Sequence, residues 1–173
     1  MRLFIAVEFD SNIFRLIQNK IDTSNLKLKF TNTYHLTVKF LGEVSDEKVE
    51  LIKRRLGEVK FSSFDVLLGD IGFFPNAHYV KVIWVGFFAN DKINELQRKV
   101  DDALSELFSS EKRFHAHITL ARVRDIFDKE KLSENINSIQ FEKLKFNVNG
   151  FKLMKSNLTP EGPVYIELAE FKA

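Results

Sequence analysis

Two short strings, His35-Leu36-Thr37-Val38 and His117-Ile118-Thr119-Leu120, each set a histidine and a threonine on either side of one apolar residue. Alternate residues of a β-strand share a face, so in each string the imidazole and the hydroxyl would point one way. The apolar residues would point the other way, into a core. Two such strands side by side would form one pocket with two imidazoles and two hydroxyls. That set supplies the acid, the base and the donors for phosphate oxygens that phosphoryl transfer without a metal requires.

The order of elements around the two strings repeats. The first half predicts strands over 3–9, 34–41 and 64–74, helices from residue 10 or 11 to 21 and over 45–56, and a basic strand or loop over 26–33. The second half predicts strands over 79–88 and 114–123, helices over 90–107 and 128–136, and an extended segment over 141–154. A turn over 157–162 and a strand over 164–171 follow. We therefore expect one α+β domain over 1–173, bilobal, with duplicated halves 1–77 and 78–173 and a pseudo-two-fold axis that sets His35 opposite His117 across a central cleft.

Composition restricts the chemistry. The chain of 173 residues fits one compact domain or two small lobes, and it has no cysteine, which excludes disulfides, thiolate nucleophiles and cysteine zinc sites. The apolar run over 3–7 is closed by Glu8 and Asp10, too short for a signal peptide or a membrane span, so we expect a cytoplasmic protein. The net charge of +2 indicates that any contact with RNA is local. No glycine pattern for nucleoside triphosphates or dinucleotides occurs.

With both strings in view, the chain resembles the two-histidine phosphoesterase superfamily, and within it the RNA 2′,3′-cyclic phosphodiesterases, also called 2′-5′ RNA ligases. The resemblance runs over nearly the whole chain, and it rests on the opening residues 1–7, the two signatures 34–42 and 114–122, and the middle segments 72–75 and 82–86. One position departs from the family, which usually has proline directly before the second catalytic histidine, where this chain has Ala116.

The resemblance implies two antiparallel sheets that face each other across a cleft, with helices outside. It implies that the protein opens a terminal 2′,3′-cyclic phosphate on RNA to leave a 2′-phosphate, with no metal and no organic cofactor. The expected partner is an RNA with that terminus, the expected state is a monomer, and no membrane is involved. Following the family, His35 is the general acid and His117 the general base, although the residues alone allow the reverse.

Three further residues are candidates for binding the phosphate. Thr37 and Thr119 would donate to its non-bridging oxygens, and the resemblance assigns Arg122 to the same group. Strict alternation argues against Arg122, because positions 117 and 122 have opposite parity. It reaches the cleft only if the strand ends or bulges first. Lys39 shares the parity of His35 and is the geometric competitor.

Other interpretations stay open. His115 could join His117 in a metal site. The two strings could instead be core strands whose histidines are satisfied by hydrogen bonds, or the protein could be a catalytically idle RNA-binding module. The same residues could also join RNA ends through a 2′-5′ bond, with a 5′-hydroxyl in place of water, or cleave 2′-5′ oligoadenylate or a small cyclic phosphate. Tyr34, Phe74 and Trp84 could stack on a base, with core packing favoured for Trp84.

Overall fold

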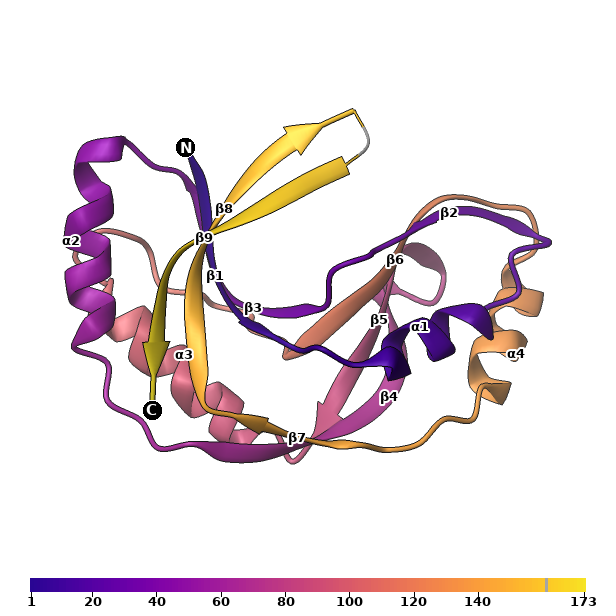
Figure 1. The fold of residues 1–173 in the computed structure, drawn as a ribbon. Helices are drawn as coiled ribbons and strands as arrows, with labels where there is room; N and C mark the ends of the chain where they lie inside the picture. The colour runs from indigo at the N-terminus through magenta and orange to yellow at the C-terminus, as the bar shows by residue number, and fades with distance from the viewer. Residues whose placement is uncertain (161) are drawn as a thin grey trace.

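The computed structural model describes residues 1–160 and 162–173, and it has an α+β fold (Figure 1). The strands are β1 (Arg2–Glu8), β2 (Leu26–Phe30), β3 (His35–Glu43), β4 (Phe64–Asn76), β5 (Tyr79–Phe88), β6 (His117–Ile126), β7 (Lys145–Val148), β8 (Gly150–Thr159) and β9 (Gly162–Lys172). The helices are α1 (Asn12–Asn19), α2 (Asp46–Gly57), α3 (Asp91–Ala103) and α4 (Lys129–Ser138). Among the described residues, no helix is both long enough and apolar enough to cross a bilayer.

Antiparallel pairing joins the described strands into one sheet in the order β7-β4-β5-β6-β3-β1-β8-β9, and β2 pairs with β6. The strands β3 and β6, which begin with the two histidines, are neighbours at the centre and meet in the pair Leu36–Ile118. The expectation of two separate sheets facing each other is not confirmed, because this backbone pair connects the two sides into one sheet.

The strand order is symmetric about the centre. Outward from β3 come β1, the first strand of the chain, and β8; outward from β6 come β5, which begins the second half, and β4. Each side is therefore completed by a strand from the other half of the chain. The helices are exchanged in the same way. The helix α3, from the second half of the chain, packs on β3, and α1, from the first half, packs on β6. In Figure 1, α2 and α3 lie at one end of the molecule and α1 and α4 at the other.

Alternation along the two histidine strands produces the core. Leu36, Val38, Ile118 and Leu120 are all at most 2% exposed, as the apolar half of each string predicts. The helix α1 closes over this face with Ile13, Phe14 and Ile17 buried, and the hydroxyl oxygen of Ser11 accepts the Ile13 N–H at 3.2 Å as its N-cap.

A β-bulge interrupts the alternation at equivalent points of both strands. In β6, Thr119 pairs with Trp84 and Ala121 with Ile83, so Leu120 is the extra residue. Two consecutive residues of β6 are then buried, and the next one, Arg122, is exposed. In β3 the extra residue is Val38, since Thr37 pairs with Ala6 and Lys39 with Ile5. Beyond each bulge, the parity that strict alternation would give is reversed.

Lys39 is therefore not a competitor for the phosphate, and that expectation is wrong. The bulge turns its side chain away from the histidine face and into the protein, where Lys39 is 4% exposed. Its ammonium group forms an ion pair with Asp101 of α3 and donates to the Ser109 carbonyl oxygen at 2.7 Å. The Asp101 carboxylate also accepts the Glu111 N–H at 2.8 Å. Lys39 thus ties β3 to α3 and to the loop after it.

The remaining differences concern where elements end. The turn expected over 157–162 is shorter, because Asn157, Leu158 and Thr159 continue the ladder with β9. Glu161 of that turn lies outside the described residues. The strand expected to break at Pro75 continues to Asn76. The second histidine strand begins three residues later than expected, at His117, and the extended segment over 141–154 divides into β7 and β8.

Removal of the Lys39 ammonium group should strongly destabilise the fold. In Lys39→Ala, the Asp101 carboxylate keeps its burial and loses its counter-charge, and a broken buried ion pair costs about 3–5 kcal/mol. The double variant Lys39→Met/Asp101→Leu removes both charges and should recover most of that loss. Urea denaturation measures the free energy of unfolding of each protein. A double variant less stable than Lys39→Ala would contradict this account of the pair.

Candidate active site

The two histidines are the first residues of β3 and β6, directly before the central pair Leu36–Ile118. Since these strands are antiparallel, His35 lies on the Thr119 side of that pair and His117 on the Thr37 side. All four side chains share one face of the sheet and are partly buried. The two imidazoles are near enough that a positive charge on His117 lowers the pKa of His35.

His35 is enclosed by aromatic rings from neighbouring strands. The Phe4 ring of β1 lies 5.3 Å from the imidazole, and the Tyr165 ring of β9 meets it edge-on at 5.1 Å. Burial lowers the pKa of His35 to about 4; the charge of Glu8 opposes this shift, while His117 and Arg122 add to it. In the free protein at neutral pH, His35 is therefore uncharged.

His117 is held by a backbone contact and an aromatic wall. Its Nδ1 donates to the His115 carbonyl oxygen at 2.7 Å, because a carbonyl can only accept. Nε2 is then left with its lone pair in the neutral ring. The Phe74 ring meets the imidazole edge-on at 4.7 Å. Burial lowers the pKa of His117, the hydrogen bond to His115 raises it, and the charges of His115 and Arg122 lower it further. The geometry suits a proton acceptor at Nε2.

Arg122 lies on the histidine face because of the bulge at Leu120. After burial, its positive charge is a further cause that lowers the pKa values of His35 and His117, and it opposes the burial that raises the pKa of Tyr165. These three side chains come from three different strands. A guanidinium group whose positive charge affects both imidazoles is positioned to bind an anion that lies between them. The bulge that Arg122 needs in order to reach the histidine face is therefore present.

The three aromatic residues considered for base stacking lie in two places: Tyr34 is in the core, whereas Phe74 and Trp84 lie beside His117. Tyr34 packs on Phe14 with ring centroids 4.8 Å apart, and its hydroxyl donates to Gln18 at 2.8 Å, so this ring belongs to the packing beneath α1. Trp84 instead lines the wall beside His117. Its ring lies 5.0 Å from Phe74 and 4.6 Å from His115.

Trp84 needs a glycine on the neighbouring strand. Gly72 of β4 pairs with Trp84 in register, and a Cβ at Gly72 would overlap the indole ring. The glycine of the segment 72–75 therefore has a steric role in the wall of the site.

Two features of the site were not found from the sequence. Tyr165 comes from the last strand, far along the chain from both strings, and only the strand order brings it to His35. The second is an ion cluster beside His35, in which the Lys152 ammonium group donates to Glu8 at 2.6 Å and to Glu167 at 2.8 Å. These contacts raise the pKa of Lys152. Neither feature has a spacing signal, because its members lie on separate strands.

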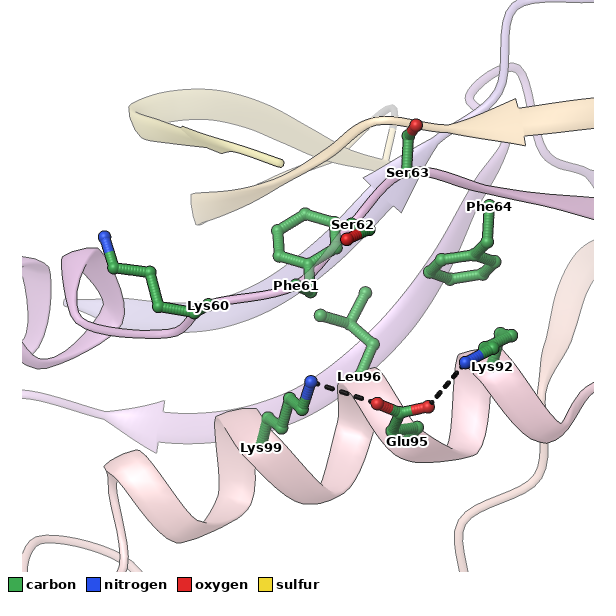
Figure 2. Close-up of a pocket in the computed structure, with 9 residues that line it drawn as sticks. All are labelled: Lys60, Phe61, Ser62, Ser63, Phe64, Lys92, Glu95, Leu96 and Lys99. Atoms are coloured by element: carbon green, nitrogen blue, oxygen red, sulfur yellow. Dashed lines mark hydrogen bonds and ion pairs between the residues drawn. The ribbon is translucent and has the colours of Figure 1, made fainter.

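The structure describes no group of three or more histidine, cysteine or carboxylate residues arranged to hold a metal ion within 1–160 and 162–173. The open pocket drawn in Figure 2 lies between the segment 60–64 and α3, and neither histidine lines it. Two of its three lysines, Lys92 and Lys99, pair with Glu95 at 3.1 and 3.0 Å. It is separate from the site formed by the two histidines.

Comparison with known proteins agrees with this geometry. A family model described as LigT like Phosphoesterase matches residues 9–84 and 88–165. A Methanocaldococcus jannaschii protein named RNA 2′,3′-cyclic phosphodiesterase is 36% identical over 176 residues, which cover 99% of this chain and 100% of that protein. A Thermotoga maritima protein of the same name is 34% identical over 98% of this chain and 94% of its own.

The fold has close structural relatives as well. The crystal structure of a Thermus thermophilus protein matches with a TM-score of 0.79 and 27% identity, over 99% of this chain and 97% of its own. Escherichia coli LigT, crystallised with 3′-AMP, matches with a TM-score of 0.75 and 23% identity over 99% and 97%, which speaks to the fold alone. The match over both halves, together with the full-length relatives, shows that the chain belongs to the LigT-like family of two-histidine phosphoesterases.

Proposed function

We propose that this protein hydrolyses a terminal 2′,3′-cyclic phosphate on RNA and leaves a 2′-phosphate. The proposal depends on one observation. Arg122 and the two histidines share one face of the sheet, and the positive charge of Arg122 contributes to lowering the pKa of both imidazoles. One anionic phosphate can meet all three groups there. The names of the full-length relatives support the same substrate class.

In the proposed reaction, His117 Nε2 takes a proton from water while the water oxygen attacks phosphorus. The bond from phosphorus to the 3′-oxygen breaks, and His35 gives a proton to that oxygen. The product keeps its phosphate on the 2′-oxygen. Thr37, Thr119 and Arg122 stabilise the charge on the non-bridging oxygens during the transfer. The reaction requires neither a metal nor an organic cofactor, since acid, base and anion donors all come from this chain.

The acid role of His35 requires that it gain a proton when substrate binds. In the free protein its pKa is about 4. A bound phosphate brings a negative charge beside the imidazole, and an opposite charge at short range favours the protonated form. Binding of the anion and protonation of His35 are therefore coupled, and each strengthens the other.

We also propose that residues 1–173 form one two-lobed domain built by duplication of 1–77 and 78–173. The symmetric strand order and the exchange of α1 and α3 between the two sides support it. The bulges at Val38 and Leu120, three positions after each histidine, support it as well.

The reaction is tested with an oligoribonucleotide that ends in a 2′,3′-cyclic phosphate, in buffer with a strong chelator. The expected product ends in a 2′-phosphate. His35→Asn and His117→Asn should each lower kcat by about 10²- to 10⁴-fold, the usual contribution of a general acid or base. His78→Asn, in the exposed turn between β4 and β5, is the matched control and should be unchanged.

Other products would point elsewhere. A 3′-phosphate would mean that the other oxygen leaves. A 2′-5′ joined product with a 5′-hydroxyl RNA would favour ligation, and the absence of turnover would favour an RNA-binding module. Activity that disappears with the chelator would contradict the metal-free mechanism.

Coupled protonation of His35 is tested with sulfate, an anion that does not titrate near neutral pH. Between about pH 5 and 6.5, free His35 is mostly neutral although an ordinary histidine would be at least half charged, so sulfate binding should take up a proton. Calorimetry in two buffers of different ionisation enthalpy measures that uptake. His35→Asn should abolish most of it. Sulfate that binds the unaltered protein without proton uptake would contradict the coupling.

A further inference from the structure

Four basic residues lie on the pair of strands that extends beyond the site. They are Lys27 and Lys29 of β2 and Arg122 and Arg124 of β6, here called the basic ribbon. Lys29 pairs in register with Arg122. The adjacent residues Leu28 and Val123 also pair, and they pack into a hydrophobic cluster that includes Leu132 and Ile136 of α4. Since alternate residues point to opposite faces, the basic side chains lie on the exposed face.

The basic ribbon is continuous with the catalytic face. Arg122 is the residue of the basic ribbon nearest to His117 along β6, and its positive charge contributes to lowering the pKa of both histidines. Arg124 lies farther along β6, at a second bulge where Lys27 pairs with Asp125 and Leu28 with Val123. At about 3.3 Å per residue, Arg124 is roughly 20 Å along the strand from His117. Arg124 is therefore too far away to contact a phosphate held between the histidines, but it can contact another phosphate of the same chain.

An exposed aromatic ring marks the outer end of the basic ribbon. Phe127 is 63% exposed, and the Lys27 ammonium group lies 5.6 Å from the centre of its ring. The carboxylate in this stretch, Asp125, accepts the Ile126 N–H at 3.0 Å. In the part of the chain that the structure describes, Arg122 and Arg124 form no ion pair with a carboxylate, whereas Arg55 pairs with Glu106.

We propose that the basic ribbon binds the sugar-phosphate backbone upstream of the reacting terminus, with a base stacked on Phe127. Basic side chains that follow a strand, with an aromatic ring among them, are the elements that hold single-stranded nucleic acids without sequence preference. The preferred substrate is then an RNA chain several nucleotides long, rather than a cyclic mononucleotide. This inference rests on the proposed function for the identity of the terminus.

The test compares two substrates that share the same reacting group. One is an oligoribonucleotide of about ten nucleotides with a terminal 2′,3′-cyclic phosphate, and the other is cytidine 2′,3′-cyclic monophosphate. The variants are Lys27→Gln/Arg124→Gln and Phe127→Ala. Arg54→Gln, an exposed residue of α2 outside the basic ribbon, removes one positive charge elsewhere as the control.

The double variant should lower kcat/KM for the oligonucleotide through KM, with kcat and all mononucleotide kinetics unchanged. The slope of log(kcat/KM) against log salt should become less negative by about 0.7 for each phosphate that the variant no longer binds. Phe127→Ala should lower kcat/KM for the oligonucleotide by about 5- to 150-fold, the effect of losing one stacked base. Arg54→Gln should leave both substrates unchanged.

Binding gives a readout that does not depend on turnover. Fluorescence anisotropy with a labelled oligonucleotide ending in a 2′-phosphate should show the same losses in the same variants. Suppose that the unaltered protein hydrolyses both substrates and that the variants bind and cleave the oligonucleotide normally. The proposed RNA-binding role of the basic ribbon is then contradicted, and the proposed function stands. If neither substrate is hydrolysed but the variants bind the oligonucleotide more weakly, the proposed function is contradicted and the RNA-binding role of the basic ribbon is supported. Equal losses of kcat/KM for the oligonucleotide and for the mononucleotide would also contradict the proposed role of the basic ribbon.

Discussion

The backbone pair between Leu36 and Ile118 joins the strands that carry the two histidines, and the geometry of the site depends on it. The pair is the point where β3 and β6 meet at the centre of the sheet. Both residues are at most 1% exposed, so burial of their side chains fixes which face of each strand is left for the imidazoles. Packing on one side of the sheet therefore positions the two imidazoles on the other.

Equivalent backbone positions do not give the two histidines equivalent surroundings. His117 donates a hydrogen bond from Nδ1 to a carbonyl oxygen and faces Phe74, while His35 lies among Phe4, Tyr165 and the Glu8 carboxylate. These neighbours come from different strands on the two sides of the sheet. In a nearly symmetric frame, the different surroundings of the two imidazoles are therefore set by side chains beyond the His-x-Thr strings.

The sequence predicted the features that depend on neighbours along the chain. Alternation in the two strings and the helix expected to start at residue 10 or 11 have local causes, and the structure has both, with α1 beginning at Asn12. The buried position of Lys39 could not be predicted by counting residues, because a bulge depends on how a strand pairs with its neighbour. The same limit applies to Tyr165, whose contact with His35 exists only through the strand order.

The exchange of strands between the two sides also bears on how the chain folds. Because β8 completes the side that begins with β1, and β4 completes the side that begins with β5, neither half of the chain contains a full set of neighbours. A nascent first half would leave sheet edges without partners until the last strands emerge from the ribosome. Such non-local pairing favours slow, all-or-none acquisition of structure over stepwise assembly of independent halves.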